Sequence, residues 1–544
     1  MTSLSEKKRY IILLVIVLLA LFLRLYRISS LPALNADEAA IGYNAYSLLV
    51  TGKDEHGHSW PIEFQSFNDY KPGGYFYLTL PFIKTLGLSE ISVRLPNIIL
   101  SILSVFLIYS LTNNLFASHA SKSGINIGHL AALLLAISPW HLHFSRGGWE
   151  TNAATSLLLC GLVIYIKRPR FPKSVLISTI FIVASMYTYH SMRLIAPIFL
   201  TMIHFREFSL KRNVKTSLSL ILITMTMIAP LLYNVFANNA TSRFSGVGVF
   251  ADKGPIARAE ELRLQHSSTR NILNRLIHNK YIEFSLRIAD NYLRHFSASF
   301  LFLEGDEIQR NKIPWMGLFY YFEIVTIGVG MISIASKNEI EPKLLFLWVL
   351  IAPLASALTF QSPHALRAEN MVIPLIIISA NGLYRIFFLA PIHKLAKLSF
   401  FSLALWNFLY YFHQYHFHLA KQFPFSSQYG FRELSEYIKD QENKYDRIVI
   451  TTHYDQPYIL TLFYLKYDPS KFQSEHTLTP RDQYGFSTVN KFGKFEFDDV
   501  RWEELKDQKG TLLVATPSEV PGGISAIKEI YFPNGNVAFK LISI

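Results

Sequence analysis

The chain has 544 residues, of which 51% are hydrophobic and only 17% are charged, against about 25% charged residues in soluble domains. This composition excludes an ordinary soluble domain and predicts a polytopic α-helical membrane protein. The net charge of +13 does not point to nucleic acid, because the basic residues fall in short clusters between apolar runs, and the single cysteine, Cys160, excludes a disulfide framework.

Apolar runs that approach the length of about 20 residues needed to span a membrane recur along the chain. The first, 10–28, follows the basic start Lys7-Lys8-Arg9, and no small-residue cleavage site comes after it, so we interpret it as a retained signal anchor. Ten more bring the predicted total to about eleven: 93–116, 127–144, 153–166, 175–189, 194–205, 217–236, 314–335, 344–360, 371–389 and 398–412.

The large loop between the first two runs, 29–92, is rich in ionisable and aromatic residues. It opens with the dipeptide Asp37-Glu38, just past the outer end of the first run. Connectors between helices are usually about 2 to 8 residues long, so a loop of this length and chemistry is more typical of a binding or catalytic element. The alternative is an interfacial loop without a function in binding or catalysis, whose acidic side chains only keep it hydrated.

Basic clusters assign the two sides of the membrane. If the N-terminus lies inside, all of them fall on the inner side, as the positive-inside rule requires; they are Lys122, 167–173, 206–215, 337–343 and 394–397. Five polar segments then fall together on the outer side: 29–92, 146–150, 190–193, 237–313 and 361–370. We therefore predict a multi-pass protein of the cytoplasmic membrane with its active site on the extracytoplasmic side.

The composition changes after residue 414 to that of a soluble α/β segment. This predicts a transmembrane domain at 1–414 and an extracytoplasmic α/β domain at 415–544. Spacing of apolar residues predicts a helix at 432–440 and strands at 447–452 and 511–516. The sequence Pro533-Asn534-Gly535-Asn536 between two apolar stretches predicts a closing hairpin on a type I′ turn.

A transferase on the outer side has no nucleotide supply, so it needs a donor carried by lipid, such as a polyprenyl-phosphate sugar. Phosphate leaves as a stable anion, and the reaction then mainly needs a base for the acceptor hydroxyl. We assign Asp37 as that base, with Glu38 beside it and Glu150 orienting the base or binding the acceptor. Cations must hold the leaving phosphate, and the candidates at outer helix ends are Lys71, Arg146, Arg193 and Arg367.

Each of these residues also has a structural interpretation. An arginine or lysine near a helix end often only snorkels to lipid headgroups, and Glu150 has Arg146 as a nearby ion-pair partner. Aromatic residues that would stack on a sugar also mark membrane interfaces. The candidates for substrate binding are Asp69, Tyr70, Trp149 and His364. A divalent metal is a possible cofactor, although no fixed spacing supports its candidate ligands, which are His56, His58 and Asp69.

Several motifs recur in a fixed order along the first 390 residues or so. They are Asp37-Glu38, Lys71-Pro72, Gly87-Leu88-Ser89 followed by Val93-Arg94-Leu95-Pro96, Phe144-Ser145-Arg146, and Pro363-His364-Ala365-Leu366-Arg367. This ordered set resembles the GT-C class of membrane glycosyltransferases, in particular family 39, which includes protein O-mannosyltransferases and the aminoarabinose transferase acting on lipid A.

The resemblance implies a GT-C fold in which Asp37 is the base, Lys71 and the outer arginines contact the carrier phosphate, and the reaction inverts the anomeric centre. The chain departs from the lipid A enzymes at Tyr70, because those enzymes have an acid before the Lys-Pro step. This difference weakens the prediction of a metal site. The second acid is Glu150 where the pattern has Asp.

Three other functions fit parts of the sequence. An oligosaccharide ligase or polymerase would also use a lipid-linked donor at the outer face, whereas the transferase predicted above would have a lipid, glycan or protein as acceptor. A transporter or flippase would place ionisable groups near the bilayer midplane and show repeated halves, and neither feature is seen. A membrane sensor would not need the acid-rich first loop. The sequence does not choose the sugar or the acceptor.

Overall fold

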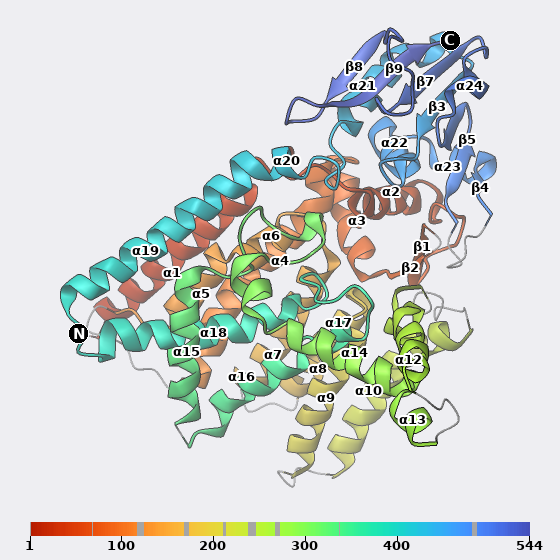
Figure 1. Ribbon diagram of the computed structural model, residues 1–544. Helices are drawn as coiled ribbons and strands as arrows, with labels where there is room; N and C mark the ends of the chain where they lie inside the picture. Colours follow the sequence, from red (N-terminus) through yellow and green to blue (C-terminus); the bar gives the residue numbers. More distant parts are fainter. Residues whose placement is uncertain are drawn as a thin grey trace. The chain divides into compact units, whose positions relative to one another are not determined.

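The computed structural model describes residues 2–67, 69–116, 124–167, 173–209, 214–237, 246–266, 272–336, 338–480 and 487–544. The side chain of Asp69 lies outside the described part, as do Lys122, Lys337 and parts of the basic clusters 167–173 and 206–215. The chain divides by contact into two compact units, and Figure 1 labels their helices and strands. Unit 1 comprises Met1–Leu21, Ile102–His143 and Ala154–Tyr411, and unit 2 comprises Phe22–Ser101, Phe144–Ala153 and Phe412–Ile544.

This division differs from the predicted boundary at residue 414. The structure groups the large first loop with the C-terminal region in unit 2, whereas the sequence placed them in separate domains. The reason is that α2 (Ala36–Thr51) buries most of its residues in an apolar core that also contains residues of C-terminal helices and strands. A pattern of apolar runs carries no information on such long-range pairing.

Unit 1 is helical, and each of the eleven predicted apolar runs overlaps one helix or several consecutive helices. The helices wholly or partly in this unit are α1 (Thr2–Leu25), α4 (Glu90–Leu115), α5 (Ile127–Ile137), α6 (Pro139–Ser145), α7 (Glu150–Lys167), α8 (Lys173–Thr188), α9 (Met192–Ser209), α10 (Val214–Ala237), η1 (Val249–Ala251), α12 (Gly254–Leu264), α13 (Ile272–Ile277), α14 (Lys280–Arg294), η2 (Ser299–Leu303), η3 (Gln309–Asn311), α15 (Tyr321–Ala335), α16 (Ile340–Ile351), α17 (Leu354–Ala357), η4 (Glu369–Met371), α18 (Val372–Tyr384), η5 (Arg385–Leu389) and α19 (Lys394–His413).

Three of the described helical segments are long and apolar enough to cross a membrane: Glu90–Leu115, Ile340–Ala357 and Glu369–Leu389. The pair α5 and α6, bent by 57°, makes a fourth if it is one span. Shorter apolar helices include Lys173–Thr188 and Tyr321–Ala335. The predicted total of about eleven spans stays a prediction.

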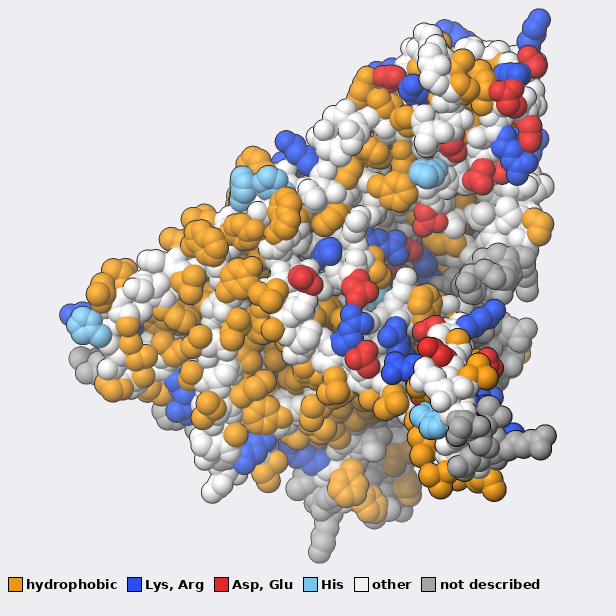
Figure 2. All heavy atoms as spheres, in the orientation of Figure 1, with side chains coloured by type: hydrophobic (Ala, Val, Ile, Leu, Met, Phe, Trp, Pro, Cys, Tyr) orange, Lys and Arg blue, Asp and Glu red, His pale blue; other side chains and the backbone are white. Residues whose placement is uncertain are grey.

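The surface of unit 1 carries many large apolar side chains. Leu14, Leu222, Ile332 and Leu398 are all more than half exposed, on α1, α10, α15 and α19. Figure 2 shows hydrophobic side chains gathered over α15 and α19 on the face that is drawn. Contiguous apolar surface of this kind marks a membrane or partner interface, so these helices present the surface expected to face lipid.

The first loop begins with α2, whose N-terminus is closed by a capping box. Asn35 accepts from the backbone N–H of Glu38, and the Glu38 carboxylate accepts from the backbone N–H of Asn35. Two otherwise unsatisfied donors are bonded in this way. The hairpin of β1 (Glu63–Ser66) and β2 (Asp69–Pro72) follows, and then α3 (Gly74–Leu86).

The C-terminal part of unit 2 is a mixed seven-stranded sheet in the order β4-β5-β6-β3-β7-β9-β8. Its strands are β3 (Arg447–Thr451), β4 (Thr477–Leu478), β5 (Val489–Phe492), β6 (Phe495–Asp498), β7 (Thr511–Ala515), β8 (Lys528–Tyr531) and β9 (Val537–Ser543). β3 runs parallel to β6 and β7, and the other pairs are antiparallel. The helical elements of this region are η6 (Gln414–His418), α20 (Leu419–Gln422), α21 (Phe431–Gln441), η7 (Glu442–Lys444), α22 (Pro457–Leu465), α23 (Pro469–Glu475) and α24 (Trp502–Leu505).

The predicted elements of this region are present, with one wrong detail. The helix at 432–440 is α21, the strands at 447–452 and 511–516 are β3 and β7, and β8 pairs with β9 as a closing hairpin. A type I′ turn needs positive φ at two successive residues. Within 533–536 only Gly535 has one, so the predicted turn type is wrong.

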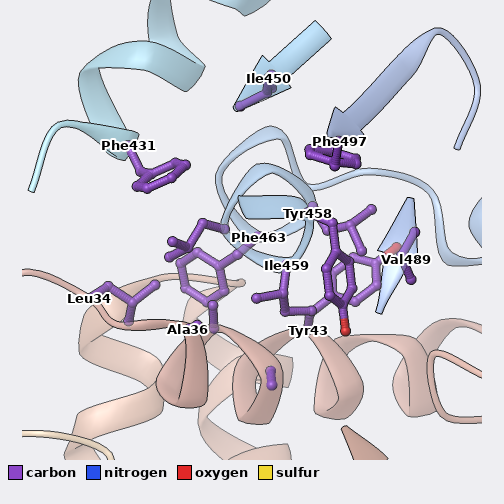
Figure 3. Close-up of a cluster of buried hydrophobic side chains, with 14 of the residues drawn as sticks. Leu34, Ala36, Tyr43, Phe431, Ile450, Tyr458, Ile459, Phe463, Val489 and Phe497 are labelled. Carbon is purple, nitrogen blue, oxygen red and sulfur yellow. The ribbon is translucent and has the colours of Figure 1, made fainter. Parts of the chain in front are cut away.

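A shared apolar core joins α2 to the sheet. Figure 3 shows α22 between them, with Ile459 and Phe463 directed toward α2 and Tyr458 beside Val489. Gly42 on α2 lets Phe463 approach so closely that a Cβ would lie 2.6 Å from the ring. The helix that carries Asp37 and Glu38 is thus fixed against the C-terminal region by close packing.

Candidate active site

Asp37 and Lys71 form an ion pair in unit 2. The Lys71 ammonium donates to the Asp37 carboxylate at 2.5 Å. Asp37 is the second residue of α2, while Lys71 comes from β2, where the hairpin register sets it opposite Phe64. The ammonium also lies 5.0 Å from the centre of the Phe67 ring, a cation–π contact. The Asp37 side chain keeps 24% of its surface exposed and the Lys71 side chain only 9%, so the carboxylate is accessible from outside while the ammonium is largely buried behind it.

Glu38, the neighbouring acid, is fully buried and saturated with hydrogen bonds. Arg94 donates to both of its oxygens, at 2.7 Å each. The backbone N–H of Gly148 donates to the same carboxylate at 2.7 Å, in addition to the capping box at Asn35. The two adjacent acids therefore have different environments: Asp37 is available to a substrate, and Glu38 ties α2 to two other segments.

Two glycines allow the segment 147–148 to approach the Glu38 carboxylate. A Cβ on Gly148 would lie 2.8 Å from Val93, and a Cβ on Gly147 would lie 2.6 Å from the Trp149 indole nitrogen. Asn97 holds the segment from α4 by donating to the carbonyl oxygens of Phe144 and Gly147. Because residues 147 and 148 have no side chains, the backbone comes close enough for the Gly148 N–H to donate a hydrogen bond to Glu38.

Arg146 is buried and bonded to backbone carbonyls. Its guanidinium donates to the carbonyl oxygens of Leu23, Arg24, Tyr26 and Leu31, and it lies 5.1 Å from the Tyr415 ring centre. The last carbonyls of a helix lack partners within the helix, and Leu23 and Arg24 stand at the end of α1. These contacts favour a role in holding the exit of α1, and phosphate binding by Arg146 stays a prediction.

The other predicted residues of unit 2 lie on neighbouring segments. Glu150 is buried and begins α7, where a carboxylate is favoured by the helix dipole. Trp149 is buried against Phe144, with ring centres 5.9 Å apart. Tyr70 stands on β2 opposite Gln65. The proposed sugar stacking by Trp149 and Tyr70 stays a prediction, as does the role of Glu150.

Three predicted residues belong to unit 1. Arg367 donates to Thr359 at 2.7 Å, and Arg193, at the start of α9, donates to the Met186 carbonyl. His364 lies 3.6 Å from Asp306, whose carboxylate also accepts from the backbone N–H of Ala365. Burial raises the pKa of Asp306. Asp306, from the loop before α15, therefore holds His364 and Ala365, while Arg367 is bonded to Thr359.

The metal candidates His56 and His58 each lie beside an acid. His58 Nδ1 is 3.1 Å from Asp54, and His56 Nε2 is 3.7 Å from Glu55. Among the described residues no group of three or more His, Cys, Asp or Glu side chains is placed to hold a metal ion. The third candidate, the side chain of Asp69, lies outside the described part, so the metal stays a prediction.

Glu55 is a buried acid whose ionisation differs from that of an exposed glutamate. Burial raises its pKa to about 8, and nearby Asp54 also raises it, while Lys71 and Asn44 act in the opposite direction. Burial also lowers the pKa of the adjacent His56 to about 3. Both side chains therefore prefer their neutral forms in the folded protein.

We expect the apparent melting temperature of the purified protein to fall between about pH 6.5 and pH 8, and Glu55→Gln to reduce this decline. Folded Glu55 keeps its proton to about pH 8, whereas unfolded Glu55, with a pKa of 4.5, has lost it. The folded state then binds more protons, so rising pH favours unfolding. Unfolded His56, with a pKa of 6.5, is still losing its proton in the lower part of this window, and this makes the decline smaller there without reversing it. The contribution of Glu55 is therefore the difference between the slopes of wild type and Glu55→Gln. Equal slopes for wild type and variant in thermal-shift measurements would contradict the assignment.

Sequence reasoning missed two residues of the site. Arg94 stands in the motif Val93-Arg94-Leu95-Pro96 but received no role, because its partner Glu38 lies 56 residues away in the chain. Glu55 was not singled out among the acids of the loop. A signal for Arg94 was present, since a charged residue inside an apolar run marks a paired or functional position.

The sequence comparisons support a relation to known glycosyltransferases. A family model described as dolichyl-phosphate-mannose-protein mannosyltransferase matches residues 70–234. No protein of curated function matches the chain. The matched segment begins at the Tyr70-Lys71 step and ends within α10, so it includes Lys71, Arg94 and Arg146.

The fold is similar to that of the solved membrane protein ArnT. ArnT from Cupriavidus metallidurans, solved with undecaprenyl phosphate, aligns over 97% of each chain with 11% identity and a TM-score of 0.51. The oligosaccharyltransferase AglB from Archaeoglobus fulgidus, solved with an inhibitory peptide and a dolichol-phosphate, aligns over 84% of this chain with 13% identity and a TM-score of 0.47. This chain covers 63% of AglB. The resemblance of this chain to the GT-C class of membrane glycosyltransferases is therefore confirmed, by a family model over part of its sequence and by its fold.

Proposed function

We propose that this protein transfers a sugar from a polyprenyl-phosphate carrier to an acceptor hydroxyl at the outer face of the cytoplasmic membrane. The observation that carries the proposal is the Asp37–Lys71 pair, with its partly exposed carboxylate and fixed, largely buried ammonium, beside the saturated Glu38. It offers a carboxylate for a proton and a cation for a phosphate in one place. A polyprenyl-phosphate donor is supported by the family description and by the lipid bound to ArnT, which shares the fold.

The reaction that we propose is a single displacement with inversion. Asp37 takes the proton of the acceptor hydroxyl as its oxygen bonds to the anomeric carbon. The bond from that carbon to the phosphate oxygen breaks, and the electron pair leaves on the phosphate. Lys71 is placed to stabilise the developing charge, since such a cation acts most strongly where it is fixed before the reaction begins.

The direct test is incubation of the purified protein with radiolabelled polyprenyl-phosphate sugars. The panel covers hexose, pentose and aminopentose donors together with a lipid-linked oligosaccharide. Loss of label from a monosaccharide lipid in wild type, and not in Asp37→Asn, supports the proposal. Use of the oligosaccharide donor alone would instead support the ligase or polymerase alternative, and no loss from any donor would refute the proposal for this panel.

Replacement of Lys71 by alanine is expected to raise the barrier to transfer by about 2.7 to 4 kcal/mol, the usual cost of losing one preorganised contact to developing charge. Lys53→Ala, which removes an exposed lysine from the same loop, is the matched control and should leave the rate unchanged. The measurement is kcat with a fixed lipid donor. If Lys71→Ala kept the wild-type kcat, the lysine would only neutralise the charge of Asp37 and would not stabilise the leaving phosphate.

The proposed topology places residues 55 and 430 outside and residue 170 inside. Alkaline phosphatase fusions should then be active after residues 55 and 430 and inactive after 170, because the enzyme folds only outside the cytoplasm. Green fluorescent protein fusions should show the reverse pattern. An active phosphatase after residue 170 would overturn the assignment of sides, which rests on the basic clusters.

A further inference from the structure

Helix α14 in unit 1 has a polarity opposite to that of a helix on a water-soluble surface. Its buried residues include two polar ones, Glu283 and Asn291. Its exposed side carries Ile282, Leu286 and Leu293. A helix in water normally buries its apolar stripe and exposes its polar face. Here the apolar stripe points away from the rest of unit 1.

The inward polar face of α14 is held by specific hydrogen bonds. Asn291 donates to the carbonyl oxygens of Ala357 and Thr359, and His295, just after the helix, bonds Ser356 at 2.8 Å. Glu283 lies 3.5 Å from Arg258 of α12. These contacts fix the rotation of the helix about its axis, so the outward direction of the apolar stripe follows from the fold.

Helix α13 extends this apolar surface. It has no buried residue, and its side chains Ile272, Leu273, Leu276 and Ile277 are all exposed. Figure 2 shows hydrophobic side chains gathered at the position of α13. These four side chains of α13, together with Tyr281, Ile282, Leu286 and Leu293 of α14, form one apolar surface, which we call the α13–α14 stripe. A soluble surface normally shows only scattered apolar residues.

We propose that the α13–α14 stripe lies in the interfacial layer of the membrane, against lipid. The stripe stands in the chain between α10 and α15, which themselves expose large apolar side chains such as Met225, Tyr233 and Val325. The cations Arg275 of α13 and Lys280 at the start of α14 lie within the same stretch of chain, and Lys280 lies 5.2 Å from the Tyr281 ring centre. Apolar side chains bordered by an aromatic ring and cations are the composition of an interfacial helix beside anionic headgroups.

The test places a fluorophore on the stripe in the full-length protein. In a Cys160→Ser background, single cysteines at Ile277 and at Leu286 carry a nitrobenzoxadiazole label, and the protein is reconstituted in phosphatidylethanolamine–phosphatidylglycerol nanodiscs. We expect nitroxide-labelled lipid to quench both labels at least about two-fold more strongly than aqueous iodide does, as for a side chain inserted at the boundary between headgroups and acyl chains.

A matched control is available just before β8 of the C-terminal sheet. Ile527 and Ile277 are both isoleucines with 49% of their surface exposed, and a label at Ile527 should be quenched mainly by iodide. The proposal is overturned if the labels at Ile277 and Leu286 behave like the one at Ile527. It is also overturned if neither quencher reaches them, because protein would then cover the stripe. The readout needs no sugar transfer, so it can be repeated in Asp37→Asn and is separate from the proposed function.

Discussion

Replacing Asp37 with asparagine is expected to lower the rate of sugar transfer at least about 100-fold, the low end of what a positioned base contributes. Asparagine has nearly the same shape and can still accept the hydrogen bond from Lys71, but it cannot take the proton of the acceptor hydroxyl. The variant should therefore insert, fold and bind the lipid donor like wild type. Transfer of label from a polyprenyl-phosphate sugar and the apparent melting temperature are the two measurements.

Glu38→Gln and Glu150→Gln serve as controls for the choice of carboxylate. Glu38 accepts from Arg94 and from the Gly148 backbone, so its amide variant should mainly lose stability. If Asp37→Asn keeps near wild-type turnover while one of the two controls is inactive in a folded protein, the base has been assigned to the wrong residue. Activity in all three variants would contradict the transferase mechanism itself.

Replacing Arg94 with methionine is expected to destabilise the protein by about 3 to 5 kcal/mol, the usual cost of leaving one partner of a buried ion pair without its counter-charge. Arg94 and Glu38 are both fully buried, and Arg94 also donates to the carbonyl oxygens of Ile28, Pro32 and Ala33. The loss should appear as a lower apparent melting temperature and lower yield of folded protein in detergent.

Arg432→Met is the matched control within the same unit. Arg432 forms an ion pair with Glu90, but its side chain is 43% exposed, and an exposed pair typically contributes about 0 to 1 kcal/mol. The double variant Arg94→Met/Glu38→Met should recover part of the loss, because it leaves no unpaired buried charge. Equal melting temperatures for Arg94→Met and Arg432→Met would refute a special role for the buried pair.

The helical part of the fold was predictable because apolar runs of helix length carry their own signal. The strands β3, β7, β8 and β9 were predicted for a similar reason, since they are apolar stretches bounded by turn residues. The strands β4, β5 and β6 were not predicted. They have two to four residues each, and β6 alternates Phe with acids in the sequence Phe495-Glu496-Phe497-Asp498, so they carry too short a pattern to separate them from loops.

The site was predictable as a set of residue types and not as a set of contacts. Asp37 and Lys71 were assigned separately to base and phosphate cation, and only the hairpin of β1 and β2 brings them together across 34 residues. Arg146 was expected near the phosphate because it follows a helix end. Its carbonyl partners at the end of α1 lie more than a hundred residues earlier, and no local pattern predicts such a contact.

The packing of α2 against the C-terminal region limits how this protein can be dissected or recombined. Gln428 accepts from the backbone N–H of Ala36, next to Asp37, and Gln473 donates to Ser47, Thr51 and the carbonyl oxygen of Asp54. Deleting residues 415–544 would therefore remove one wall of the helix that bears Asp37. A chimera with a relative should exchange residues 22–101, 144–153 and 412–544 as a single piece, since sequence change in any one of them constrains the other two.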